Sequence, residues 1–367
     1  MSGVRFSPPT RAVVKVGSSS LRTAEGRLDA DLATHLIDAV ADLRERGVQV
    51  VFVSSGAVAA GLAPLGLRQR PIDLPRLQAA ASVGQGLLVH TYQRRLAARG
   101  LAGGQVLLTP DDVVERARYL NARGTLETLL GLGAIPLVNE NDTIATEELR
   151  FGDNDRLAAL VASMLGAQLL VLLTDVDGFY EGGEVVPRLT ELSSAIARHS
   201  RRPGSDVGSG GIASKLEAAR IAAFSGAHSV IAHARAENVV HRTVLGEEIG
   251  TWCPPSRHRP ESRKLWIAFA RTPRGRIVVD KGAARALIER GSSLLAVGVE
   301  EAEGAFTVGD AVDVVHDGRV LGRGLSGLDR ETVERVRGRP TEDLAEAGEP
   351  TRAVIHRDSL VVLPHVP

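Results

Sequence analysis

Short apolar runs alternate with longer amphipathic stretches through most of the chain, and this alternation limits the fold more than any other feature. The runs are residues 11–16, 49–54, 105–109, 134–139, 169–174 and 228–232. Helical spacing of apolar residues marks stretches between them, including 29–46, 74–98, 119–132 and 212–224. Strands covered on both faces are nearly continuous in apolar residues, so this order predicts an α/β domain with an open, mostly parallel sheet sandwiched by helices.

A proline-rich segment divides the 367 residues into two predicted domains, as expected for a length well above the ~150 residues typical of one domain. Three prolines interrupt the alternation at 253–262, as in an interdomain linker. Beyond it the apolar runs are short and flank a turn signal at His316-Asp317-Gly318, which predicts a small β-barrel-like domain. The predicted boundaries are 1–252 for the first domain, 253–264 for the linker and 265–367 for the second domain.

Composition excludes several classes of protein. The 44 basic and 44 acidic residues cancel, so the chain has no overall attraction to nucleic acids or membranes. No apolar run reaches the ~18 residues of a membrane-spanning helix, and the first residues lack the apolar centre of a secretory signal. Cys253 is the only cysteine, which excludes an internal disulfide and a multi-cysteine zinc site. We therefore expect a cytoplasmic protein without a membrane segment.

Lysine is rare in this chain, because only four of the 44 basic residues are lysines and the others are arginines. A lysine that persists in such a sequence marks a position where a compact ammonium group suits the chemistry better than a planar guanidinium. Lys15 and Lys215 both lie beside glycine-rich turns, so we interpret them as functional. Lys264 and Lys281 have no such setting and are interpreted as surface residues.

Three small-residue loops resemble anion-binding turns. Residues 15–20, 54–57 and 208–215 join a strand or loop to a predicted helix, whose free N–H groups can face an anion. Each loop alone is equally well explained as a tight turn, whereas the three together favour a polyphosphate and an acid as ligands. The third is not a Walker A loop, because Ser214 rather than glycine precedes Lys215. A GxGxxG match at 322–327 lacks a βαβ context and is interpreted as turn glycines.

Two polar loops, 139–143 and 151–155, supply several amides and carboxylates. Helix capping would use one acid, and the others remain for binding. Asp142 could hold an ammonium group, Asn154 could donate to a carboxylate, and Asp155 could orient a lysine. None of the ten histidines lies in these loops. This pattern favours phosphoryl transfer to a carboxylate, because a carboxylate of pKa ~4.3 is already ionised at neutral pH and needs no general base.

These motifs resemble the glutamate 5-kinase family, which has the amino-acid-kinase fold and an appended PUA domain. The matching stretches are KVGSSS at 15–20, SSGAVAAG at 54–61, QVLLT at 105–109, NENDT at 139–143, FGDNDRLAALVA at 151–162, LLTDVDG at 172–178, GSGGIASK at 208–215 and VDKGAARALIERGSSLL at 279–295. The resemblance implies ATP-dependent phosphorylation of the glutamate side-chain carboxylate to glutamyl 5-phosphate, with Mg²⁺ bridging the phosphates, as the first step of proline biosynthesis.

The resemblance also implies roles for individual residues. Lys15 and Lys215 would neutralise charge on the transferred phosphoryl group, and Asp155 would hold the two lysines. Ser55, Asp142 and Asn154 would bind glutamate. ATP would be bound by Lys15, Thr174, Asp175, Ser209, Gly210, Gly211, Ile212, Ala213, Ser214 and Lys215.

Partners and rival functions follow from the same resemblance. It implies feedback inhibition by proline, a downstream glutamyl-phosphate reductase and a homo-oligomer. PUA domains also occur in RNA-modifying enzymes, but residues 271–367 contain 14 basic and 16 acidic residues, and this net charge of −2 argues against RNA. Another amino acid kinase, acting on acetylglutamate, aspartate, carbamate or a nucleoside monophosphate, is a rival. Asp142 suits a free α-ammonium group and would be poorly used by an N-acetylated substrate, and the appended PUA-like domain also favours the glutamate enzyme.

Overall fold

The computed structural model describes residues 4–23, 26–109, 112, 116–144, 154–200, 211–256 and 273–362. The chain divides into two compact units, Met1–Arg257 and His258–Pro367, and each is described by itself. Residues 257–264 of the predicted linker lie outside the described residues, so its boundaries stay a prediction.

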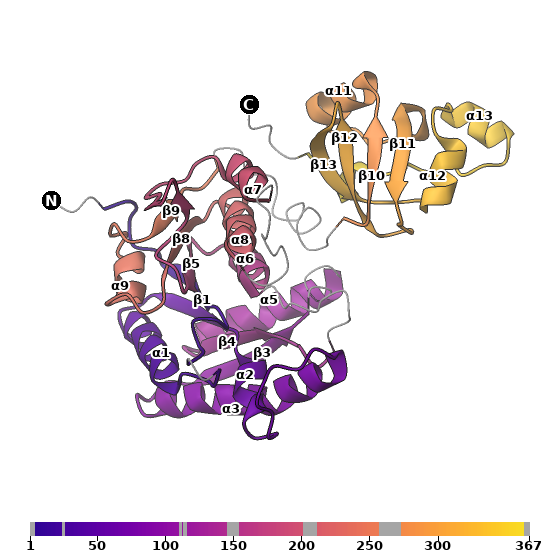
Figure 1. The fold of residues 1–367 in the computed structure, drawn as a ribbon. Helices are drawn as coiled ribbons and strands as arrows, with labels where there is room; N and C mark the ends of the chain where they lie inside the picture. The colour runs from indigo at the N-terminus through magenta and orange to yellow at the C-terminus, as the bar shows by residue number, and fades with distance from the viewer. Residues whose placement is uncertain are drawn as a thin grey trace. The chain divides into compact units, whose positions relative to one another are not determined.

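A single twisted sheet forms the centre of the first unit (Figure 1). Its strands are β1 (Arg11–Val16), β2 (Gln49–Ser54), β3 (Gly103–Leu108), β4 (Ile135–Glu140), β5 (Leu169–Thr174), β8 (His228–His233) and β9 (Thr251–Cys253). These seven described strands pair in the order β3-β4-β2-β1-β5-β8-β9. All neighbours are parallel except β8 and β9, which confirms the predicted mostly parallel α/β sheet.

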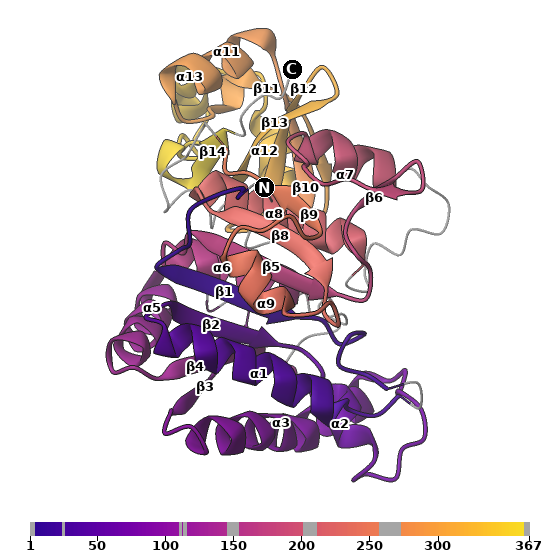
Figure 2. The same cartoon turned by 90° about the vertical axis from the view of Figure 1, so that its left-hand side faces the viewer.

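Helices cover both faces of this sheet. They are α1 (Ala30–Glu45), α2 (Ala57–Leu62), α3 (Leu74–Ala97), α5 (Arg116–Gly131), α6 (Asn154–Met164), α7 (Leu192–Ser200), α8 (Ile212–Ser225) and α9 (Val239–Val244). Figure 2 shows α1 and α9 in front of the strands, where they pack on buried Val14, Phe52 and Val171. Helices α6 and α8 contact each other and lie on the other side of the sheet in Figure 1.

Alternation along β1 decides which side chains face which helices. Val14 and Val16 belong to the core cluster shared with α1 and α9, so Lys15 between them points to the opposite face, where α6 contacts β1. Asp29 caps α1 by accepting from the Leu32 N–H at 2.9 Å, and Asp73 caps α3 in the same way from Arg76 at 3.1 Å. These two caps fix the residues at which α1 and α3 begin.

The second unit is a smaller, β-rich domain. Its elements are β10 (Gly275–Val279), α11 (Lys281–Arg290), η2 (Ala296–Gly298), β11 (Val299–Gly304), β12 (Ala311–His316), β13 (Arg319–Leu325), α12 (Arg330–Val336), α13 (Thr341–Glu346), η3 (Arg357–Ser359) and β14 (Leu360–Val362). Five described strands pair in the order β11-β10-β12-β13-β14. Asp317 and Gly318 have positive φ between β12 and β13, which confirms the predicted turn.

Several elements differ from the sequence prediction. The strand expected at 105–109 begins at Gly103. The antiparallel edge strand β9 and the hairpin of β6 (Tyr180–Glu181) and β7 (Glu184–Val185) were not predicted. Gly322 and Gly324, from the rejected GxGxxG match, lie in β13 and pack closely against the chain near β14. No described helix is both long enough and apolar enough to cross a membrane.

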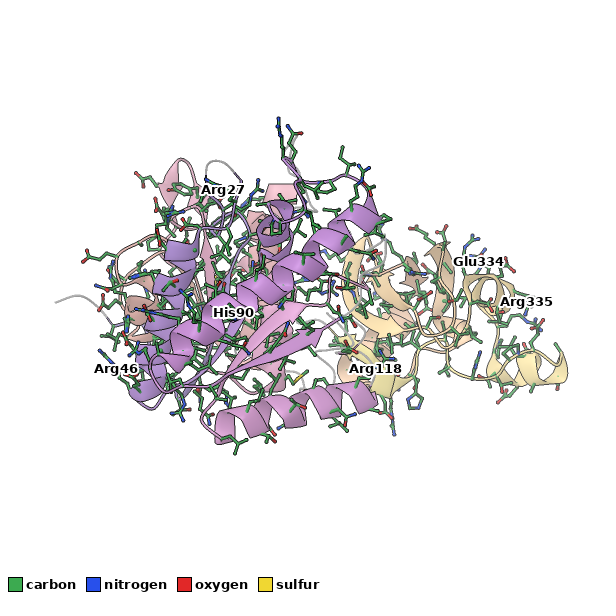
Figure 3. All side chains as sticks on the ribbon, turned by 90° about the horizontal axis from the view of Figure 1, so that it is seen from below. Arg27, Arg46, His90, Arg118, Glu334 and Arg335 are labelled. Carbon is green, nitrogen blue, oxygen red and sulfur yellow. The ribbon has the colours of Figure 1, made fainter. Side chains whose placement is uncertain are left out.

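Helices α2 and α3 approach each other so closely that glycine is required at their contact. A methyl group on Gly84 would lie 1.8 Å from the carbonyl oxygen of Ala57, and one on Gly61 would lie 1.9 Å from that of Ala80. Gly86, two residues along α3, has open space around it. Figure 3 shows α3 along its length, with exposed His90 on its surface.

We expect Gly84→Ala to lower the free energy of unfolding by about 2–3 kcal/mol, because α2 must move away from α3. Gly86→Ala is the matched control and should leave stability unchanged or raise it by up to ~1 kcal/mol, since alanine is the better helix former. Urea unfolding of the two variants measures the difference. Equal midpoints would contradict the close contact between the helices.

Candidate active site at the carboxyl edge of the sheet

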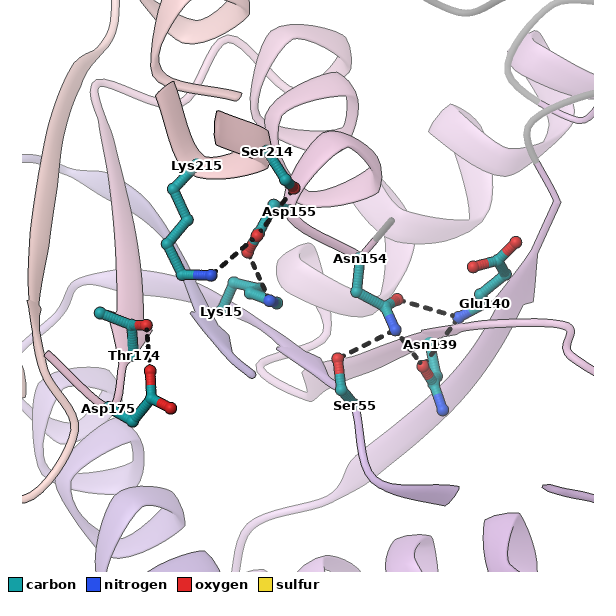
Figure 4. Close-up of polar contacts among 10 residues, drawn as sticks. All are labelled: Lys15, Ser55, Asn139, Glu140, Asn154, Asp155, Thr174, Asp175, Ser214 and Lys215. Carbon is teal, nitrogen blue, oxygen red and sulfur yellow. Dashed lines mark hydrogen bonds and ion pairs between the residues drawn. The ribbon is translucent and has the colours of Figure 1, made fainter. Parts of the chain in front are cut away.

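A buried carboxylate joins two lysines from different elements. Lys15 lies near the end of β1, Asp155 in the first turn of α6 and Lys215 in the first turn of α8. Asp155 Oδ1 accepts a hydrogen bond from Lys15 Nζ, and Asp155 Oδ2 accepts from Lys215 Nζ at 3.1 Å and from Ser214 Oγ at 3.0 Å. Figure 4 shows both ammonium groups directed at this one carboxylate.

Burial makes this ion cluster electrostatically strong. Asp155 is 1% exposed, and Lys15 and Lys215 are also buried. Burial alone would raise the pKa of Asp155, but the charges of Lys15 and Lys215 outweigh it and hold that pKa below its ordinary value. Asp155 is therefore ionised at neutral pH, and the N-terminus of α6 also favours a negative charge at this place.

A second polar cluster lies beside the first and involves Ser55, Asn139 and Asn154. Asn154 Nδ2 donates to Ser55 Oγ at 3.0 Å and to Asn139 Oδ1 at 3.0 Å. Asn154 Oδ1 accepts from the backbone N–H of Glu140 at 3.2 Å. Ser55 Oγ accepts the hydrogen bond from Asn154 Nδ2. The hydroxyl hydrogen of Ser55 can therefore be donated to a ligand.

The buried hydroxyl groups of Ser54 and Tyr92 hold Ser55 in position through hydrogen bonds. Ser54 Oγ donates to the Ser55 carbonyl at 3.0 Å, and the Tyr92 hydroxyl lies 2.8 Å from Ser54 Oγ. Ser54 has a single hydroxyl hydrogen, so Tyr92 is the donor to Ser54. Gly56, with φ of 104°, then turns the chain sharply into α2. Tyr92 on α3 thus fixes the position of Ser55 across the sheet edge.

The cavity next to this cluster contains the third predicted glutamate-binding residue. Its lining includes Ser55, Asp142 and Asn154, together with Ser18 and Gly56. Burial raises the pKa of Asp142 to about 6, and the positive charge of Arg70 opposes this rise. Asp142 is consequently charged at neutral pH, but a small fall in pH neutralises it.

Other predicted residues lie at the neighbouring strand and helix ends. Thr174 ends β5, and its hydroxyl donates to Asp175 Oδ1 at 3.1 Å. Gly211 precedes α8 and provides no side-chain cap, so the N–H groups of Ile212 and Ala213 have no partner within the helix and could face a ligand. Ser209 and Gly210 lie outside the described residues.

The structure thus groups the described, sequence-predicted residues by position. Lys15, Asp155, Ser214 and Lys215 form the ion cluster; Ser55, Asp142 and Asn154 line the cavity; Thr174 and Asp175 form a pair at the end of β5. Sequence reasoning gave no role to Asn139, Ser54, Tyr92, Arg22 or Arg70, which contact or line the same site. Asn139 and Ser54 carried a signal, because they belong to the polar loop 139–143 and to the small-residue loop 54–57.

The arrangement is suited to transfer of an anionic group. Two ammonium groups and an uncapped helix N-terminus can stabilise negative charge that develops on a phosphoryl group. Within the described ranges, no group of three or more His, Cys, Asp or Glu side chains is placed to hold a metal ion. A magnesium ion carried by a nucleotide still fits, since it takes phosphate oxygens and waters as most of its ligands.

Comparison with known proteins agrees with an α/β phosphotransferase. The pattern of the amino acid kinase family matches residues 10–233, and that of the PUA domain matches residues 275–346. The first match covers more than half of the chain, so the chain belongs to the amino acid kinase family.

Similarity to individual proteins narrows the assignment within this family. The chain is 50% identical over 368 residues to a protein of Streptomyces avermitilis named glutamate 5-kinase, covering 96% of each chain. Proteins with the same name from Salinispora arenicola and Caldanaerobacter subterraneus are 48% and 43% identical, with at least 96% of each chain covered. These likenesses identify the chain as a member of the glutamate 5-kinase branch of the family.

We expect Asp155→Asn to lower the free energy of unfolding by about 3–5 kcal/mol, because two buried ammonium groups lose their shared carboxylate. Ser214→Ala keeps both ion pairs and removes one hydrogen bond to Asp155, so it should cost only about 1 kcal/mol. Guanidinium unfolding at neutral pH compares the two variants. A loss for Asp155→Asn no larger than that for Ser214→Ala would contradict the central role of this carboxylate.

Proposed function

We propose that the protein transfers the γ-phosphoryl group of ATP to the side-chain carboxylate of L-glutamate, giving L-glutamyl 5-phosphate and ADP. This is the first step of proline biosynthesis. The observation that carries the proposal is the juxtaposition of the Lys15–Asp155–Lys215 cluster with a cavity lined by Ser55 and Asp142. The similarity to proteins named glutamate 5-kinase supports the same substrate.

Each end of glutamate has a chemical partner in this cavity. Asp142 would hold the α-ammonium group. Ser55, oriented by Asn154, would donate its hydroxyl hydrogen to the side-chain carboxylate and place that carboxylate near the lysines. The carboxylate is ionised at neutral pH, so one of its oxygens attacks the γ-phosphorus without a general base. The new O–P bond forms as the bond to the leaving ADP oxygen breaks.

ATP would lie along the uncapped start of α8. The backbone amides from Gly211 to Ser214 would face its phosphates, and Thr174 and Asp175 would contact the nucleotide at the end of β5. Lys15 and Lys215 would meet the charge on the transferred group, held in place by Asp155. Mg²⁺ bound to the phosphates would neutralise further charge. This is catalysis by fixed positive charge and positioning.

The direct test traps the acyl phosphate with hydroxylamine and measures the hydroxamate together with ADP. L-Glutamate, N-acetylglutamate, L-aspartate and a no-acceptor control are compared. Hydroxamate with glutamate alone is the expected result. Turnover with N-acetylglutamate would overturn the assignment of Asp142, and turnover with L-aspartate would overturn the choice of glutamate as substrate. No ADP from any acceptor in folded protein would contradict the proposed kinase activity.

Removing either ammonium group should impair the chemical step more than substrate binding. We expect Lys15→Ala and Lys215→Ala each to reduce kcat at least ~100-fold while the KM for glutamate changes little. Lys281→Ala, in the exposed first turn of α11, is the control and should retain wild-type turnover. Steady-state kinetics with saturating ATP measure these effects. Wild-type turnover in either variant would remove that lysine from the mechanism.

Glutamate binding should depend on pH through Asp142, whose pKa is raised to about 6. The ammonium group binds the ionised form, so affinity is complete above this pKa and is lost as the pH falls through it. At pH 5 about a tenth of Asp142 is ionised, and the KM for glutamate should be about tenfold higher than at pH 7.5. Asp142→Asn should have a uniformly high KM without this titration; a variant that keeps the wild-type profile would assign the titration to another group.

Regulation and context follow from the family resemblance and are part of the proposal. Proline would inhibit by competing for the glutamate cavity, a glutamyl-phosphate reductase would consume the unstable product, and the protein would act in the cytoplasm as a homo-oligomer. Initial rates at saturating proline test the first of these, and unchanged activity would exclude it.

A further inference from the structure

Two arginines line the glutamate cavity, and the proposed function leaves them without a role. Arg22 comes from the loop between β1 and α1, and Arg70 comes from the loop between α2 and α3. Throughout the part of the chain that the structure describes, no hydrogen bond or ion pair joins either guanidinium to another side chain. Arg95 and Arg99, by contrast, are paired with acids on α1.

The charges of these arginines act on each other and on Asp142. Burial raises the pKa of Asp142, and the charge of Arg70 lowers it. Burial lowers the pKa of Arg70, and the charge of Arg22 lowers it further. Arg70 therefore interacts with a like charge, Arg22, and with an opposite charge, Asp142, in the same cavity. Two neighbouring guanidinium groups repel each other, and an anion bound beside them relieves this repulsion.

The position of Arg70 in the cavity indicates which anion it receives. Ser55 accepts a hydrogen bond from Asn154, the residue before Asp155, whereas Asp142 and Arg70 interact electrostatically within the same cavity. A glutamate whose side-chain carboxylate reaches Ser55 presents its α-carbon to Asp142. That carbon carries an ammonium group and a carboxylate, which match an acid and an arginine respectively.

ATP is a less suitable occupant for this place. Among the described residues that line the cavity, none belongs to α8, and neither Thr174 nor Asp175 is included. The phosphates are expected at the start of α8, so they would not reach both arginines. A planar guanidinium also pairs with a carboxylate through two parallel hydrogen bonds, which a lysine at this position would not reproduce.

We propose that Arg70, supported by Arg22, binds the α-carboxylate of the substrate and thereby makes the enzyme select free α-amino acids. This inference rests on the proposed glutamate kinase activity. Asp142 then binds the α-ammonium group, and Arg70 separately binds the α-carboxylate. Loss of Arg70 should weaken only substrates that possess an α-carboxylate or its equivalent.

Two glutamate analogues separate the two halves of this recognition. 4-Aminobutyrate is glutamate without the α-carboxylate, and glutarate is glutamate without the amine. ADP formation is measured for the three substrates with the wild-type protein, Arg70→Met and Arg70→Lys. Arg68→Met is the matched control, because Arg68 lies in the same loop and is exposed like Arg70 but does not line the cavity.

Arg70→Met should reduce kcat/KM at least ~30-fold for glutamate and for glutarate, through KM, while kcat/KM for 4-aminobutyrate stays within about twofold of wild type. Arg70→Lys should recover part of the loss, and Arg68→Met should match wild type. If 4-aminobutyrate turnover is too slow to quantify, its inhibition constant against glutamate replaces it and should also be unchanged in Arg70→Met.

Equal losses for glutamate and 4-aminobutyrate would overturn the inference, because they would mean that Arg70 supports the structure of the site. Unchanged glutamate kinetics in Arg70→Met would overturn it as well, and both outcomes leave the kinase activity intact. Failure of the wild-type protein to form ADP with glutamate would instead contradict the proposed function, and the role of Arg70 would fall with it.

Discussion

One carboxylate organises the candidate active site, because Asp155 binds Lys15 from β1 and Lys215 from α8 at the same time. A buried ammonium group is costly unless an acid compensates it, and a shared acid brings two such groups close together despite their repulsion. The sheet, α6 and α8 must therefore pack in one arrangement for the cluster to form. The positive charge proposed for catalysis and the packing of the fold therefore depend on the same interaction.

The topology of the sheet explains why these residues meet. β1 lies between β2 and β5, and the chain extends the sheet to one side of β1 before it returns to the other. Ligands of open parallel sheets bind at such a reversal, at the carboxyl ends of the strands. Here the ends of β1 and β2 supply Lys15 and Ser55, while the close contact at Gly61 and Gly84 holds α2 beside them.

Much of the site could be predicted from the sequence because its main residues lie in short, unusual motifs. The scarcity of lysine singled out Lys15 and Lys215, and the polar loops contained Asp142 and Asn154. Other contacts could not be predicted, since they join residues far apart in the chain without a local pattern. Tyr92 reaches Ser54 across 38 residues, and Arg70 lies in an ordinary-looking loop.

Contacts between residues far apart in the chain also explain which strands the sequence did not predict. The alternation of apolar runs predicted the parallel strands correctly, because each is long enough to show continuous burial. The antiparallel strand β9 has only three residues, Thr251–Cys253, and pairs with β8 through contacts that the sequence pattern does not contain. The two hydrogen bonds from Asn154 to Ser55 and Asn139 likewise form only in the folded chain and leave no pattern in the sequence.

Direct attack by the substrate carboxylate on ATP is the central chemical claim, and isotopic labelling tests it most directly. Glutamate carrying ¹⁸O at both oxygens of its side-chain carboxylate is incubated with ATP and hydroxylamine. Hydroxylamine attacks the acyl carbon of the product and releases phosphate that retains the attacking oxygen. Mass spectrometry should find one ¹⁸O atom in each released phosphate, whereas unlabelled phosphate formed at the same rate would show that another acceptor received the phosphoryl group.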